Sequence, residues 1–177
     1  MKIILIILAL IIIAILVLYN SLVKSKNNIK EKQANIDVYL NQRFDLIPNL
    51  VETVKGYVKH ESDLLTDITN SRLSYISDTG NLKNGENLNN KMNKLLAVAE
   101  NYPELNASEQ FSNLQKNLTK IEDQLQGARR IYNKAVTSYN NKIQTVPSNL
   151  VAILFGFKEE ELFEIIEYKK DNVSLKF

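Results

Sequence analysis

Residues 109–143 read EQFSNLQKNLTKIEDQLQGARRIYNKAVTSYNNKI, and this stretch decides the fold. From Phe111 onward its apolar residues recur at alternating spacings of three and four, the pattern of a coiled-coil-like helix seam. Asn106 is expected to cap this helix, with Glu109 three positions later completing a capping box. We predict that the helix runs to about Thr145, a length of roughly 55–60 Å.

A second long apolar stripe precedes this helix and is its natural partner. The stripe consists of Ile29, Ile36, Leu40, Ile47, Val51, Val54, Val58, Leu65 and Ile68. Pro48 interrupts the stripe without changing its phase, which we interpret as a kink in one helix. Alternatively, Asp45 caps a new helix that has Pro48 in its first turn. Packed antiparallel, the two long helices predict an all-α bundle.

The segment between these helices is rich in glycine and asparagine from Ser77 to Asn87, which predicts a surface loop. A short helix is expected to follow from Leu88, and Pro103 closes it because the residue before a proline disfavours the α conformation.

Pro147 is expected to end the long helix, after which Ser148 can cap a brief apolar helix that stops at Gly156. This helix is too short to span a bilayer. We expect it to cover the end of the bundle; the alternative is that it lies against the membrane surface. A strand-like end is expected at residues 173–177.

The amino-terminal run from Ile3 to Leu18 is apolar without interruption and is long enough to nearly cross a bilayer core of about 30 Å. A cleaved secretory signal is the competing interpretation. The run exceeds the roughly 7–15 residues usual for such a signal, and no pair of small residues follows it. We predict a retained transmembrane signal-anchor over residues 1–19, with lipid contacts through residues 3–18.

Flanking charge predicts the orientation of this anchor. Lysines 24, 26, 30 and 32 follow the apolar run, whereas Lys2 alone precedes it. Basic residues are enriched on the cytoplasmic side of a membrane span. We therefore expect a single-pass protein of the cell membrane, with its short N-terminus outside and its body in the cytoplasm. That body comprises a helical bundle domain over residues 20–157 and a C-terminal tail over residues 158–177 that packs on the bundle.

Composition excludes several classes of function. The 177 residues include no cysteine, so disulfides and thiolate chemistry are absent. Acidic and basic residues nearly balance at a formal charge of +2, which argues against a nucleic-acid surface. His60 is the single histidine, and it lies in no metal-binding spacing. The sequence indicates no catalytic residue, metal ligand or cofactor.

Polar residues close to the predicted helix seam are the candidate functional residues. Tyr132-Asn133 and Tyr139-Asn140 stand seven residues apart and therefore present the same helix face. Buried groups of this kind commonly fix the register between helices, but they can also form a recognition surface for a partner. The candidate interaction or register residues are Arg43, Asp45, Asn49, Arg129, Arg130, Tyr132, Asn133, Tyr139 and Asn140.

The chain resembles the LemA family. The similarity lies in YNSLV after the anchor and in the stretches 43–61, 99–111, 128–143, 147–150 and 156–158, which follow the family order. The tail departs from the family pattern, because no proline precedes its closing VSLKF. The resemblance implies a membrane-anchored bundle of long antiparallel helices with a cytoplasmic body and no established enzymatic activity.

We therefore expect a non-enzymatic helical scaffold that binds or localises an unknown protein partner at the cytoplasmic face of the membrane. Self-assembly into a homo-oligomer is possible, because a long apolar stripe can also pair between chains. The alternative from another class is a ligand-binding or hydrolytic protein that uses an interhelical carboxylate pocket.

Overall fold

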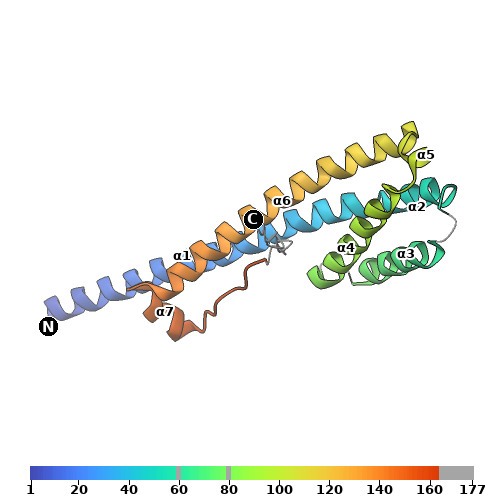
Figure 1. Ribbon diagram of the computed structural model, residues 1–177. Coiled ribbons are helices and arrows are strands. Elements are labelled where there is room, and N and C mark those ends of the chain that lie inside the picture. The colour runs from blue at the N-terminus through green and yellow to red at the C-terminus, as the bar shows by residue number, and fades with distance from the viewer. Residues whose placement is uncertain (59–60, 79–80, 164–177) are drawn as a thin grey trace, which may run out of the picture. The chain divides into compact units, whose positions relative to one another are not determined.

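The computed structural model describes residues 1–58, 61–78 and 81–163. Every regular element in these ranges is a helix, which confirms the predicted all-α class (Figure 1). The predicted strand-like end at 173–177 lies outside the described residues. The helices are α1 (Lys2–Phe44), α2 (Ile47–Lys55), α3 (Ser62–Ser77), α4 (Leu82–Ala99), α5 (Pro103–Asn106), α6 (Glu109–Gln144) and α7 (Ser148–Phe155).

The helices are grouped in two compact units, each described here by itself. Unit 1 comprises Met1–Lys30 and Arg129–Phe177, of which the part up to Phe163 is described. Unit 2 comprises Glu31–Ala128. Helices α1 and α6 each contribute to both units. The predicted domains 1–19, 20–157 and 158–177 stay a prediction.

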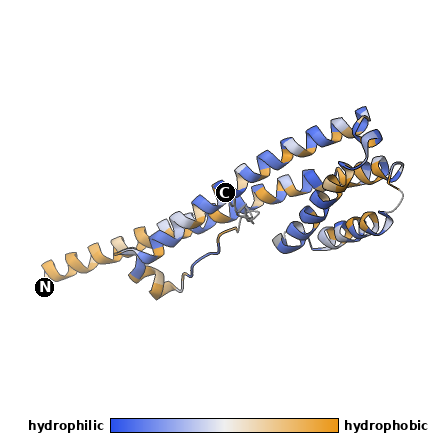
Figure 2. Cartoon of the chain, viewed as in Figure 1, coloured by the Kyte–Doolittle hydropathy of each residue, from blue (hydrophilic) through white to orange (hydrophobic). Residues whose placement is uncertain are grey.

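Helix α1 carries the apolar run into the body without a break. Figure 2 colours its amino-terminal part as a run of hydrophobic residues. An 18-residue window of this helix has a mean hydropathy of 3.2, and none of its residues is fully buried. By length and composition it can cross a membrane, although a signal sequence would meet the same criterion.

Helix α1 ends at Phe44, and α2 is a separate helix with Pro48 in its first turn. The kink interpretation is therefore wrong, as is the single helix reaching Ile68. A proline has no N–H and clashes with the carbonyl four residues earlier, which here belongs to Phe44. That carbonyl instead accepts a hydrogen bond from Nε of Arg72 at 3.1 Å. The alternative interpretation placed Pro48 correctly, but Leu46 and not Asp45 occupies the cap position.

The predicted loop 77–87 is too long, because α4 already begins at Leu82. The Asn81 side chain caps it by accepting hydrogen bonds from the backbone N–H groups of Lys83 and Asn84. Gly85 lies inside this helix, where a Cβ atom would come within 3.1 Å of the Leu40 side chain and 3.3 Å of the Tyr75 ring. This glycine permits close helix packing and does not mark a turn.

Helix α6 ends at Gln144, close to the predicted end, but it begins at Glu109. Ser108 caps it by accepting from the Phe111 N–H at 3.5 Å, whereas the predicted cap Asn106 is the last residue of α5. Helix α7 stops before Gly156, as predicted, and this glycine adopts a left-handed conformation with φ 71°. Ser148 does not cap α7; its hydroxyl donates to the carbonyl of Lys142 at 2.6 Å.

Within each unit, α1 lies beside α6 (Figure 1). In unit 1, the Lys142 ammonium of α6 donates to Ser25 Oγ of α1 at 2.7 Å. In unit 2, the guanidinium of Arg43 pairs with the Glu122 carboxylate. These contacts place the late part of α6 beside the early part of α1, as in the predicted antiparallel pairing.

Candidate functional site

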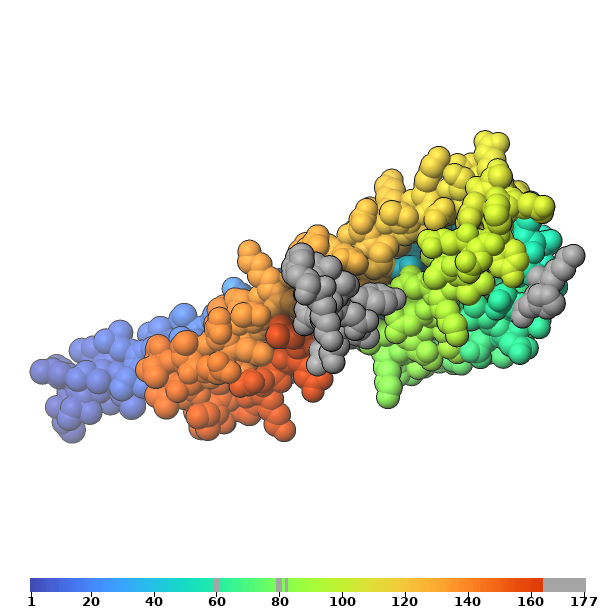
Figure 3. All heavy atoms as spheres, viewed as in Figure 1, coloured from blue at the N-terminus to red at the C-terminus, as the bar shows by residue number. Residues whose placement is uncertain are grey.

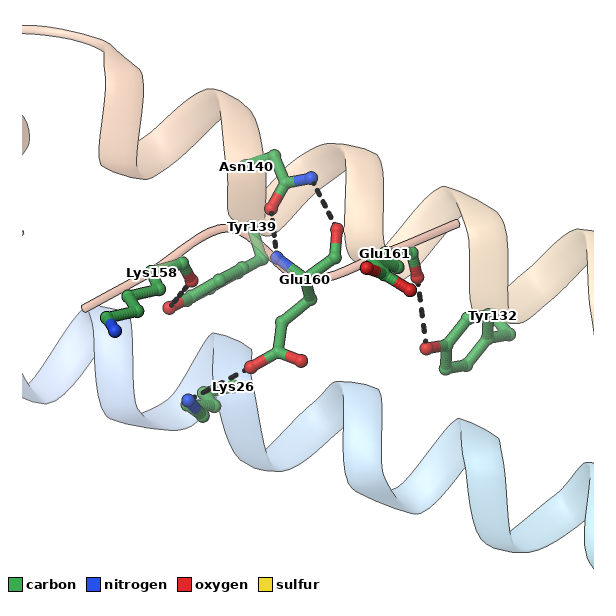
Figure 4. Close-up of polar contacts among 7 residues, drawn as sticks. All are labelled: Lys26, Tyr132, Tyr139, Asn140, Lys158, Glu160 and Glu161. Carbon is green, nitrogen blue, oxygen red and sulfur yellow. Dashed lines mark hydrogen bonds and ion pairs between the residues drawn. The ribbon is translucent and has the colours of Figure 1, made fainter. Parts of the chain in front are cut away.

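The two Tyr-Asn pairs of α6 hold residues 158–163, which we call the strap. In Figure 3 the strap lies against the C-terminal part of α6, and Figure 4 shows its polar contacts. The strap follows α7 in the chain and has no regular secondary structure. All of these residues belong to unit 1.

Each asparagine forms two hydrogen bonds with the main chain of one strap residue. Asn140 donates from Nδ2 to the Glu160 carbonyl at 2.9 Å, and its Oδ1 accepts from the Glu160 N–H at 3.0 Å. Asn133 makes the same pair of bonds with Phe163, at 2.9 and 2.8 Å. Each side-chain amide thus pairs with the strap main chain as a neighbouring β-strand would. It satisfies one main-chain N–H and one main-chain carbonyl that have no partner in a helix or sheet.

The spacing of the two asparagines matches the strap. Seven helical residues separate them, which is about 10.5 Å at 1.5 Å per residue. Their partners Glu160 and Phe163 are three residues apart, and three residues of nearly extended chain cover about 10 Å. One heptad of α6 therefore fits three residues of an extended segment, and both asparagines can bind it in register.

The two tyrosines add hydroxyl donors on the same face. Tyr139 donates to the Lys158 carbonyl at 2.9 Å, and Tyr132 donates to the Glu161 carbonyl at 3.2 Å. Burial raises the pKa of both hydroxyls above the usual value. Both hydroxyls therefore stay protonated, and able to donate, beyond the ordinary tyrosine range.

Two strap side chains make specific contacts. Glu160 pairs with Lys26 of α1 at 2.9 Å, and the hydrogen bond to this carboxylate raises the pKa of the Lys26 ammonium. Phe163 is buried, with its ring edge-on to Tyr132 and the Arg129 guanidinium 4.7 Å from its centroid. The strap is thus held mainly through its main chain, with Glu160 and Phe163 as side-chain anchors.

A different polar arrangement occurs in unit 2 around Arg43. This side chain is 2% exposed and contacts two other helices of the unit. Its guanidinium pairs with Glu122 of α6 and donates to Asn93 Oδ1 of α4 at 2.6 Å. Arg43 therefore joins α1, α4 and α6 through a single buried charge.

The remaining predicted residues are exposed and do not belong to these two clusters. Asp45 lies 3.8 Å from Arg72, and not beside Arg43. Asn49 lines an open groove of about 530 Å³ in unit 2, together with residues of α2 and the start of α6 that include Glu52, Tyr57 and Gln110. Arg130 is an exposed residue of α6.

A sequence model of the LemA family matches residues 32–177, which is most of the chain. The chain belongs to the LemA family. The match covers the helices that carry both polar clusters and the strap.

Individual relatives agree with the LemA assignment. Protein LemA of Metamycoplasma hominis is 26% identical over 158 residues, covering 87% of this chain and 72% of that protein. Magnetosome proteins MamQ 1 and MamQ 2 of Paramagnetospirillum magneticum are each 24% identical over 179 residues, covering 85% of this chain. The chain spans 66% of the length of these two MamQ proteins.

Sequence reasoning placed the Tyr-Asn pairs of this LemA protein on one face but missed what they bind. Their strap partners, chiefly Lys158 and Glu160, lie in a segment without periodicity, so no pattern marked them. Asn93 was missed as a partner of Arg43 for a different reason: it lies on a third helix, so the contact depends on tertiary packing. The charge pair Lys26–Glu160 had one available signal, an acidic run after α7 and basic residues early in α1.

The described residues contain no group of three or more acidic, histidine or cysteine side chains that could hold a metal ion. His60 lies outside the described residues. Glu122, an acidic residue of α6, pairs with Arg43. Its carboxylate therefore neutralises the buried Arg43 guanidinium and is not available as a general base.

Proposed function

We propose that this LemA protein is a membrane-anchored helical scaffold whose body binds or localises a partner protein at the cytoplasmic face. The observation that carries the proposal is the exposed apolar surface of α1. Every isoleucine and leucine from Ile3 to Ile13 is 50–73% exposed, on all sides of one helix. A helix that is apolar all round requires an apolar solvent, and a bilayer supplies one.

Lysines 24, 26, 30 and 32 of α1 support the cytoplasmic placement of the body. Protease treatment of intact, wall-stripped cells tests it, with a tag after Phe177. We expect the tagged body to survive until the cells are permeabilised. Digestion in intact cells would contradict the orientation, and recovery of the chain in the soluble fraction would contradict the anchor.

The groove lined by Asn49 is the surface on which we place the partner contact. It is open and mixed in character, with Tyr57 beside Glu52 and Gln110. Tyrosine is favoured at protein interfaces, and partly polar linings are typical of non-obligate ones. We further propose that Arg43, Arg129 and the two Tyr-Asn pairs serve internal register, because Arg43 contacts α4 and α6 and the other residues contact the strap.

A photo-crosslinking amino acid at position 49 tests this placement in the full-length, membrane-resident protein. The matched control is Asn117, another exposed asparagine, on α6 outside the groove. We expect a discrete crosslinked protein from position 49 and none from position 117. Equal products from both positions, or none from either, would contradict a partner at the groove. A product of twice the chain's mass would show self-assembly instead.

The scaffold is proposed to be non-enzymatic. The Glu122 carboxylate of α6 pairs with Arg43 and so is committed to that ion pair. No observation in the described residues favours the alternative, a hydrolytic interhelical pocket, over the scaffold.

A further inference from the structure

Helix α7 is apolar on two faces, and only one of them is packed. Val151 and Ala152 are buried. The side chains pointing the other way are large and exposed: Leu150 is 65%, Ile153 77%, Leu154 70% and Phe155 51% exposed. A contiguous apolar face of this kind on a short helix marks a contact with something apolar.

The packed face of α7 shows the level at which that contact lies. Val151 and Ala152 form one cluster with Leu22 of α1, and Ile15 and Leu18 pack against this cluster. Ile15 and Leu18 belong to the proposed membrane span. Helix α7 therefore lies alongside the last turn of the span and the turn that follows it, all within unit 1 (Figure 1).

Aromatic rings gather at the same level. The Tyr19 ring lies 4.8 Å from the ring of Phe155 and 5.7 Å from that of Phe157, centroid to centroid. Tyrosine is enriched where the hydrocarbon core meets the headgroups. Just beyond Tyr19 on α1, Ser21 and Ser25 accept hydrogen bonds from the Lys142 ammonium at 3.4 and 2.7 Å, so polar surroundings begin there.

The turn after α7 keeps the helix short. Gly156 is left-handed, and the Phe157 N–H bonds back to the Ala152 carbonyl at 2.9 Å, which ends the helix after eight residues. Eight residues extend about 12 Å, too little to cross a bilayer. The chain then continues with Lys158 into the strap. An uncharged helix of this length beside a span suits the interfacial region of one leaflet.

We propose that α7 is a second membrane contact, whose exposed face inserts among the lipid acyl chains at the body side of the bilayer. This inference rests on the proposed anchor. A bilayer is favoured over another occupant because the exposed face is continuous with the span. The span itself, at about 24 Å for 16 residues, is shorter than a core of about 30 Å, so the level of α7 lies close to the edge of the acyl chains. The expectation that α7 covers the bundle end therefore describes only its inner face.

The chain has no tryptophan, so a single introduced indole reports its own surroundings. The test uses three full-length variants in nanodiscs that hold one chain each, with and without acyl-chain-brominated phosphatidylcholine. Leu154→Trp probes α7, and Val17→Trp probes the span. Ile131→Trp is the matched control, because Ile131 is 55% exposed on α6 of the same unit. Circular dichroism verifies the helix content, and Ile153→Trp replaces Leu154→Trp if that variant misfolds.

We expect brominated lipid to quench Leu154→Trp at least half as strongly as Val17→Trp, and to leave Ile131→Trp unquenched. Quenching of Val17→Trp alone would overturn the α7 contact and leave the anchor intact. An unquenched Val17→Trp would instead contradict the anchor. Shielding of Leu154→Trp only in discs with two chains would assign the exposed face to a second copy and overturn the lipid contact.

Discussion

Units 1 and 2 are held by opposite kinds of polar contact. Among its described residues, unit 2 has one buried cation, Arg43, whose carboxylate and amide partners come from two other helices. Unit 1 has neutral amides and hydroxyls of α6 that bind the main chain of a segment without regular structure. Removing one partner of a buried charge costs several kcal/mol at once, about 3–5, because the remaining charged group is left uncompensated. Removing one neutral hydrogen bond costs about 1 kcal/mol and leaves the others in place. We therefore expect that a single substitution at Arg43 destabilises unit 2 strongly, whereas in unit 1 each substitution of a strap contact has a smaller, local effect.

Replacing Arg43 should give the largest effect. Arg43→Met leaves the Glu122 carboxylate and the Asn93 amide without their partner, at an expected cost of about 3 kcal/mol in the free energy of unfolding. Hydrogen exchange followed by mass spectrometry should show faster exchange throughout residues 31–128. The control is Gln42→Met, an exposed neighbour on α1. Equal loss of protection in both units would remove the contrast between them.

The asparagine clamps come next. Asn140→Ala removes both hydrogen bonds to Glu160, an expected loss of about 1–2 kcal/mol confined to the strap. Limited proteolysis should then cut within residues 158–163 while α6 stays protected, and adding Asn133→Ala should increase the cutting further. Asn141→Ala is the matched control, since Asn141 is an exposed asparagine on the same helix. Global unfolding of the Asn140→Ala variant would show that a single substitution destabilises unit 1 as strongly as unit 2.

One substitution in unit 2, at the carboxyl of Asp37, is expected to increase the free energy of unfolding. Burial raises the pKa of the Asp37 carboxyl, and its Oδ1 has no hydrogen-bond partner among the described residues. The folded state thus binds this proton more tightly than the unfolded state, so stability falls as pH rises from the ordinary to the raised pKa. Asp37→Asn should raise the unfolding free energy at pH 7 by about 0.5–1 kcal/mol.

Thermal unfolding at pH 7 and at pH 3 checks this prediction for Asp37. The stabilisation should shrink at the lower pH, where the wild-type carboxyl is protonated in both states. Asp123→Asn, an exposed acidic residue on α6, should change little at either pH. A destabilised Asp37→Asn variant at pH 7 would mean that the carboxylate has a favourable partner.

The surface ion pair of unit 1 should matter least. Lys26 and Glu160 are each about one-third exposed, so Glu160→Gln should cost no more than about 0.5 kcal/mol. The pKa of Lys26 is raised, so the pair contributes at neutral pH and is lost as the pH rises through that raised value. Strap exchange rates, with Glu161→Gln as control, provide the measurement. A loss as large as that of Asn140→Ala would make charge, and not the amides, the main contact.

The sequence predicted the helices wherever periodicity carried the information. The seam of α6 and the helix stop at Gly156 are both local properties, and both are confirmed. The break before α2 was misread because the apolar phase continues across Pro48, whereas the free Phe44 carbonyl finds its partner in the distant Arg72. Gly85 was interpreted as a turn residue for a similar reason. The close approach of Leu40 and Tyr75 arises from tertiary packing, which the local sequence does not reveal.

The candidate site divides in the same way. Heptad spacing placed Tyr132-Asn133 and Tyr139-Asn140 on one face, and the structure shows all four side chains bonded to one segment. The strap could not be anticipated, because main-chain recognition requires no particular side chain at most of its positions. Asp45 is close to Arg43 in the sequence, but its exposed carboxylate lies 3.8 Å from Arg72.

The uninterrupted course of α1 has a mechanical consequence. No hinge separates the apolar run from the residues to Lys30 that pack in unit 1. With the apolar run in a bilayer, a tilt or an axial rotation of the span would turn unit 1 by the same angle. Bilayer thickness, which sets the tilt of a span, would then set the direction in which unit 1 presents its strap.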